Sequence, residues 1–133
     1  MKAETYLERV KIIDGILPDK REDYARWVEL AEGLGGFSVS DRVQSSKNLQ
    51  QMQKAIDKYL DIEREIDALE QERIEIIKTL ESLPRYEYKT LHTIYVKDGT
   101  LKEIAYMFGM SYSWAKEKKK NGLSLIQAIL DER

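Results

Sequence analysis

The chain has 133 residues, of which 42% are hydrophobic and 35% are charged. This composition is typical of a folded, helix-rich protein and excludes a disordered chain. The absence of cysteine excludes disulfides, thiolate metal sites and cysteine nucleophiles. The N-terminal residues are too charged for a signal peptide and no apolar run reaches membrane-spanning length, so we expect a cytoplasmic protein without membrane contact.

Charge is distributed unevenly along the chain. The net charge is −2 overall, but residues 1–84 carry −5 and residues 85–133 carry +3. Much of the positive charge is concentrated in a lysine run over 116–120. An acidic region joined to a basic module is expected where only the basic part touches DNA. We therefore predict a helical, coiled-coil region over 1–84 and a DNA-binding domain over 85–133.

The first 46 residues predict two short helices and a loop. Apolar residues recur at helical spacing over 3–16, and Pro18 is expected to end that helix. A second amphipathic pattern covers 21–32, so the two helices should pack as an antiparallel pair. Residues 33–46 are rich in glycine and serine, which predicts a linker. The alternative is a loop whose serines hold a ligand.

A long helix is predicted from Lys47 to Leu83, where proline and glycine are absent. From Ile62 onward its apolar residues follow a heptad seam in which Arg73 takes one position, and a skip is expected near Tyr59. Such a seam needs a partner, which the first two helices or a second subunit can supply, and we predict a homodimer. Arg73 either specifies register or pairs with a glutamate across the seam, or it extends to the edge of an ordinary bundle.

The C-terminal part predicts three shorter helices. The first covers 86–96, and the second follows a capping box made by Thr100 and Glu103. Gly109 is suited to end the second helix and Ser111 to cap the third. Two short helices joined by a glycine turn form a helix-turn-helix. The expected fold class is therefore all-α, with a helix-turn-helix after a long heptad-bearing helix.

A resemblance to the fourth-region helix-turn-helix of bacterial sigma factors is carried by YEYKTLHTIYVKDGTLKEIAYMFGMSYSWAKEKKKNGLSLIQAIL. The family's scaffold pattern is matched by Gly99–Ala105 and its Gly-x-Ser turn by Gly109–Ser111. More loosely, a Val-Gln-Ser-Ser segment at 43–46 before such a module resembles small regulators of Gram-positive phages and integrative elements, such as late-gene activators of the ArpU type. The resemblance implies a transcriptional regulator in a bacterial host cell, with double-stranded DNA as its partner and RNA polymerase as a second one.

Helical periodicity divides the expected recognition helix, about residues 111–121, into two faces. Ala115, Gly122 and Ile126 are taken to point inward. On the outward arc, Lys116 suits guanine O6 and N7, and Glu117 suits cytosine N4. The candidate DNA-binding residues are Ser111, Tyr112, Ser113, Trp114, Lys116, Glu117, Lys118, Lys119 and Lys120.

Three residues depart from the sigma-factor pattern. Ala115 and Lys118 stand where branched apolar residues are usual, and Gly122 replaces a good helix former. Trp114 either fills the volume that Ala115 leaves or stacks on a deoxyribose. Lys118 and Lys119 are assigned to DNA phosphates. If four phosphates are neutralised, the logarithm of the binding constant should fall with the logarithm of the salt concentration with a slope of roughly −3.6.

No residue pattern indicates catalysis, a metal site or a cofactor. His92 is the only histidine, and it lies among apolar helix residues, which predicts a structural role. We therefore expect no enzyme activity. Two other functions stay open, namely a phage DNA-packaging subunit of the small-terminase type and a coiled-coil interaction protein that does not bind DNA. The first predicts a ring of many subunits.

Overall fold

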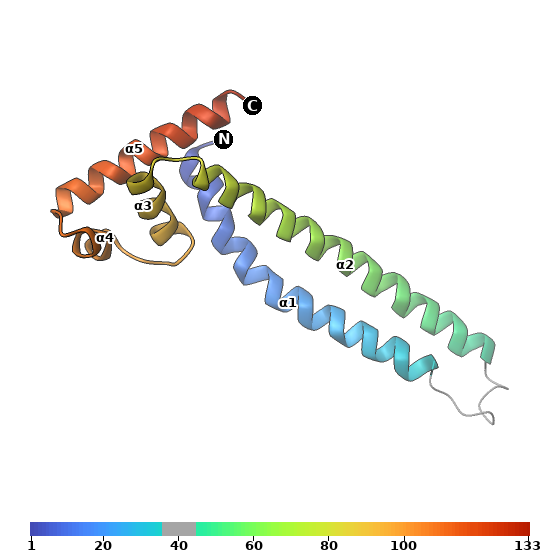
Figure 1. The fold of residues 1–133 in the computed structure, drawn as a ribbon. Helices are drawn as coiled ribbons and strands as arrows, with labels where there is room; N and C mark the ends of the chain where they lie inside the picture. The colour runs from blue at the N-terminus through green and yellow to red at the C-terminus, as the bar shows by residue number, and fades with distance from the viewer. Residues whose placement is uncertain (36–44) are drawn as a thin grey trace. The chain divides into compact units, whose positions relative to one another are not determined.

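The computed structural model describes residues 1–35 and 45–133, which form five α-helices and no strand (Figure 1). The helices are α1 (Ala3–Gly35), α2 (Ser45–Glu81), α3 (Arg85–Tyr95), α4 (Leu101–Phe108) and α5 (Tyr112–Asp131). The all-α prediction is confirmed. Most of the predicted linker lies outside the described residues, and the parts of it that are described, 33–35 and 45–46, are helical. None of the five helices has both the length and the apolar character that a membrane span requires.

The chain divides into two compact units. The first unit combines residues 1–14 with residues 71–133, and the second contains residues 15–70. One hydrophobic core in the first unit joins the N-terminal end of α1, the C-terminal end of α2, α3 and α5, and its buried members are Ala3, Leu7, Val10, Ile76, Leu80, Leu83, Leu91, Tyr95 and Ile126. This core crosses residue 84, where the sequence predicts a domain boundary.

The helix α1 continues through Pro18, so the predicted helix end there and the predicted pair of short helices are wrong. Proline removes one helix hydrogen bond, which costs about 3 kcal/mol in a helix interior. The helix continues because one stripe of seven-residue spacing lies on both sides of the proline, at Val10, Leu17, Tyr24 and Ala31. Packing of that stripe outweighs the lost bond, and Pro18 itself is exposed.

The packed face of α2 follows an unbroken heptad pattern. One heptad series along α2 and the turn that follows is buried or half-buried at every position, namely Met52, Ala55, Tyr59, Ile62, Ile66, Leu69, Arg73, Ile76, Leu80 and Leu83. The predicted skip near Tyr59 is wrong, because the seam passes through the fully buried Ala55 and not through the larger Ile56. Within the second unit, Tyr59 meets Tyr24 of α1 edge-on, with ring centroids 5.8 Å apart.

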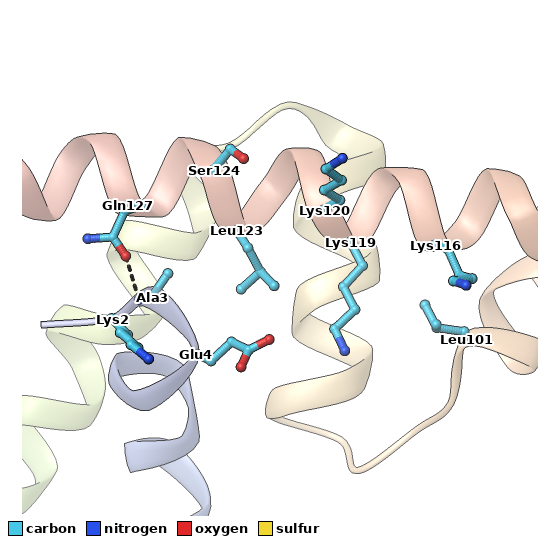
Figure 2. A pocket seen from close by; sticks show the side chains of 10 residues that line it. All are labelled: Lys2, Ala3, Glu4, Leu101, Lys116, Lys119, Lys120, Leu123, Ser124 and Gln127. Atoms are coloured by element: carbon cyan, nitrogen blue, oxygen red, sulfur yellow. Dashed lines mark hydrogen bonds between the residues drawn. The ribbon is translucent and has the colours of Figure 1, made fainter.

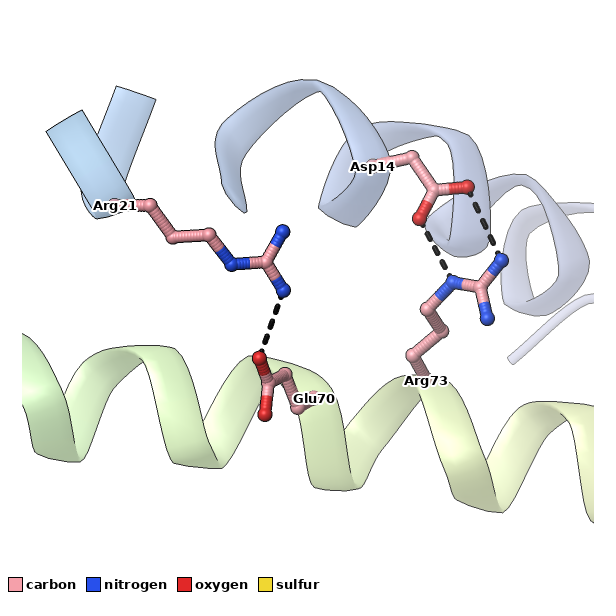
Figure 3. A network of polar contacts seen from close by, with 4 residues as sticks. All are labelled: Asp14, Arg21, Glu70 and Arg73. Carbon is pink, nitrogen blue, oxygen red and sulfur yellow. Dashed lines mark hydrogen bonds and ion pairs between the residues drawn. The ribbon is translucent and has the colours of Figure 1, made fainter. Parts of the chain in front are cut away.

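The charged residue in the seam is paired within the chain. Arg73 donates from Nε and Nη2 to the two carboxylate oxygens of Asp14 in α1, at 2.7 and 3.4 Å (Figure 3). In the second unit, Arg21 of α1 donates to Glu70 of α2 at 2.8 Å (Figure 3). Arg73 therefore pairs across the seam as predicted, but with an aspartate of α1 and not with a glutamate. Dimerisation stays a prediction, although the seam that suggested it is covered by α1.

Candidate nucleic-acid interface

The base of the candidate interface is the packing of α5 on α3. The residues of α3 that face inward are Glu87, Thr90, Leu91, Thr93 and Tyr95. Gly122 of α5 is buried against them, and a Cβ added there would lie 2.8 Å from Leu91 Cδ1. A side chain cannot fit at that distance without moving its neighbour. Gly122 is therefore the point at which the two helices approach closely.

Both ends of α4 have the predicted geometry. The backbone N–H of Glu103 donates to Thr100 Oγ1 at 3.2 Å, and Glu103 Oε2 accepts from the backbone N–H of Thr100 at 3.4 Å, which confirms the capping box. Gly109 ends the helix in the left-handed conformation, with φ 63° and ψ 34°. That conformation favours glycine because it has no Cβ. The turn between α4 and α5 is thereby set by local sequence.

The N-terminus of α5 begins directly after this turn. Ser111 Oγ accepts from the backbone N–H of Trp114 at 3.1 Å, so the predicted N-cap is confirmed. The two helices share a small core in which Ile104 and Ala105 of α4 pack with Ala115 of α5. These contacts pack the first turns of α5 against α4, beyond the Gly109 turn that joins the two helices.

The predicted two faces of α5 are confirmed. Ala115, Gly122 and Ile126 are buried. The five residues of the expected outward arc are all exposed, namely Tyr112, Ser113, Lys116, Glu117 and Lys120. The ammonium group of Lys116 lies 5.9 Å from the centre of the Tyr112 ring. The arc thus presents two cations, one carboxylate, one hydroxyl and one phenol to solvent.

Trp114 is part of an aromatic cluster and not of this arc. Its ring meets Phe108 of α4 and Tyr86 of α3 edge-on, with centroid distances of 5.7 and 5.4 Å. It packs beside the core that contains Ala115. The cluster favours the alternative in which Trp114 fills the volume beside a small residue.

Lys118 turns toward α3 and away from the arc. Its Nζ lies 3.5 Å from Glu87 Oε1, and the two side chains are 24% and 11% exposed. The same ammonium group lies 5.7 Å from the centre of the Trp114 ring and 5.9 Å from that of Tyr86. Lys118 therefore takes the place of an apolar residue by packing its stem and pairing its charge inside the fold. The assignment of Lys118 to a DNA phosphate stays a prediction, and its contacts within the fold argue against it.

Replacing Lys118 with alanine should lower the free energy of unfolding by roughly 1–3 kcal/mol, because a nearly buried Glu87 would lose its counter-charge. Lys118→Met keeps most of the stem and should show the loss of charge alone. Combining Lys118→Met with Glu87→Gln should restore most of the stability. Chemical denaturation of the four proteins measures these differences, and equal stability of wild type and Lys118→Met would show that the pair is unimportant.

Lys119 lines an open groove of about 530 Å³ between α5 and the N-terminal end of α1 (Figure 2). The groove is lined by Lys2, Ala3, Glu4, Leu101, Lys116, Lys119, Lys120, Leu123, Ser124 and Gln127. Figure 2 shows Lys119 directed from α5 toward the segment that holds Glu4. The groove continues the exposed arc of α5 through Lys116 and Lys120, so both belong to one surface.

Sequence reasoning missed two residues that determine which lysines reach this surface. Glu87 lies four residues before Leu91 and eight before Tyr95, so helical spacing could have placed it on the buried face of α3. Lys2 has no local signal, because more than a hundred residues separate it in sequence from the helix that it faces across the groove.

His92 has its predicted structural setting, beside the Tyr88 ring. Partial burial and the nearby lysines Lys97 and Lys89 lower the pKa of His92.

Among the residues that the structure describes, no three His, Cys, Asp or Glu side chains are grouped so that they could hold a metal ion. The candidate interface contains cations, hydroxyl groups, the exposed ring of Tyr112 and the carboxylates of Glu117 and Glu4. Comparison of the chain with protein-family models, with curated proteins and with solved structures finds no match.

Proposed function

We propose that this chain is a sequence-specific transcriptional regulator of phage or mobile-element type that places the N-terminal half of α5 in the major groove of double-stranded DNA. The observation that carries the proposal is the exposed arc of Tyr112, Ser113, Lys116, Glu117 and Lys120. This arc lies on the second helix of a capped helix-turn-helix. In helix-turn-helix proteins the second helix contacts base edges with its N-terminal residues.

The side chains of the arc have the chemistry that base reading requires. Lys116 can donate to O6 and N7 of guanine, and Glu117 can accept from N4 of cytosine. Ser113 can donate or accept, and the amide groups near Ser111 lie at a helix N-terminus, where phosphate binding is favourable. The arc therefore combines groups that can distinguish bases with groups that can bind the phosphate backbone of DNA.

The pairing of basic residues supports the same surface. Along α1 and α2, ion pairs within the chain engage seven of the eleven basic residues, namely Arg9, Lys11, Lys20, Arg21, Arg26, Arg64 and Arg73. In contrast, Lys116, Lys119 and Lys120 have no carboxylate within 4.0 Å among the described side chains. Cations that are not neutralised within the protein remain free to bind phosphates.

Selection of duplexes from a random pool by the full chain tests the proposal. We expect one motif to be enriched, and a duplex carrying it to bind more tightly than a scrambled duplex by a factor of about 10³ or more. With Lys118 engaged inside the fold, the other three lysines of the run predict a log–log salt slope of about −2.7. Selection that returns no motif would contradict sequence-specific binding, whatever the overall affinity.

A further inference from the structure

The groove beside α5 holds more positive charge than the recognition arc alone. Lys2 of the N-terminal segment lines it together with Lys116, Lys119 and Lys120, and Glu4 is the one carboxylate in its lining. None of the four ammonium groups has a carboxylate within 4.0 Å among the side chains that the structure describes. Like charges gathered around one groove repel each other, so an anion bound there would be stabilised.

The N-terminal segment is fixed to α5 and does not merely pass near it. Gln127 of α5 accepts from the backbone N–H of Ala3 at 2.9 Å and donates from Nε2 to the carbonyl of Met1 at 3.0 Å. Ala3 is buried in the same core as Ile126, the neighbour of Gln127. Lys2 therefore has a defined position relative to α5, and both of its peptide neighbours are held by one side chain.

The extent of the groove favours a polyanion over a single small anion. Its lining runs along α5 from Lys116 to Gln127, which is about 16 Å at 1.5 Å per residue. One strand of duplex DNA carries a phosphate about every 3.4 Å of helix axis, so several phosphates can face a surface of that length. The groove also starts at Lys116 and Lys120, the two cations of the proposed recognition arc.

We propose that the N-terminal end of α1 is part of the DNA interface, with Lys2 and Lys119 binding phosphates of the strand that borders the major groove. Gln127 is the positioning residue that holds Lys2 in place. The inference rests on the proposed function, since it assigns a second contact to the same duplex. Because phosphate contacts carry no sequence information directly, Lys2 should contribute equally to all sequences.

Fluorescence anisotropy with the selected duplex and a scrambled one, over a series of salt concentrations, tests the inference. Lys2→Ala should weaken binding to both duplexes by about 5- to 10-fold near 0.1 M salt and make the log–log slope less steep by about 0.9. Glu4→Gln should strengthen binding to both by about threefold, because it removes the carboxylate from the groove. The matched control is Lys78→Ala, an exposed lysine of α2 in the same unit.

The outcomes separate the two proposals. Weaker binding by Lys2→Ala together with tighter binding by Glu4→Gln supports the inference, since a damaged fold cannot produce the gain. Wild-type affinity of both variants, with sequence-specific binding intact, overturns the inference and leaves the proposed function standing. Absence of duplex binding by the wild-type chain overturns both, and so does Lys2-dependent binding of inorganic phosphate without any binding of duplex.

Discussion

Replacing Lys116 and Lys120 together with alanine is expected to weaken binding of the selected duplex by roughly 30-fold or more, if each lysine contributes about 1 kcal/mol or more to recognition. Both side chains are exposed on α5 and lie one helical turn apart, so we expect them to contact the same stretch of the DNA major groove. Loss of the Lys116 contact should also relax the preference for the base that it reads. Anisotropy titrations with the selected duplex and with single-base variants measure both effects.

The matched control for that pair is Lys54→Ala with Lys58→Ala. These two lysines are also four residues apart and exposed, but they lie on α2 in the second unit. The control removes the same net charge without touching α5, and we expect its affinity to stay within about twofold of wild type. Equal loss of affinity in the two double variants would show that only net charge matters and would contradict recognition by α5.

Gly122→Ala is expected to lower the free energy of unfolding by about 1–2 kcal/mol, although alanine is the better helix former by about 1 kcal/mol. The added Cβ would lie 2.8 Å from Leu91 Cδ1 and 3.1 Å from Leu91 Cγ. Leu91 is fully buried, so its side chain has no free space into which it can turn. Overpacking between α3 and α5 should therefore outweigh the gain in helix propensity.

Gly15→Ala is expected to have the opposite effect on stability in the same protein. Gly15 is also inside a helix, but a Cβ there would meet no atom within 4 Å. Alanine should therefore raise the free energy of unfolding by up to about 1 kcal/mol. Thermal and chemical unfolding of both variants give the comparison. If Gly122→Ala also stabilised the protein, the close approach of α5 to α3 would be wrong.

Local signals in the sequence were sufficient for the C-terminal helices. The capping box at Thr100, the left-handed Gly109 and the cap at Ser111 each act over three or four residues, and all three occur as predicted. Spacing along one helix also identified Ala115 and Ile126 as inward residues. Such features depend on neighbouring residues alone, so they can be inferred without knowledge of the fold.

The errors in the long helices have a common cause, which is packing between distant segments. Pro18 alone suggests a helix end, but the stripe that packs on both sides of it keeps α1 continuous. Ala55 is too small to stand out in a hydrophobic pattern, yet it is fully buried in the seam of α2. In each case a tertiary contact outweighs the local preference.

The same limit applies to the candidate site. The exposed arc could be predicted from the helical periodicity of α5 alone. The contacts of Lys118 and Lys2 could not. Lys118 forms an ion pair with Glu87 of α3, and Gln127 of α5 holds the N-terminal segment that contains Lys2. Sequence reasoning could therefore identify the exposed face of α5, whereas the contacts of Lys118 and Lys2 could be found only from the fold.

Backbone amide shifts of the full chain, recorded during titration with the selected duplex, test the central claim most directly. We expect the largest changes over residues 111–120, at the N-terminal half of α5, and none in the second unit, residues 15–70. Such a result would place the duplex on the exposed arc. Changes confined to the second unit, or none at saturating duplex, would contradict the assignment of α5 as the recognition helix.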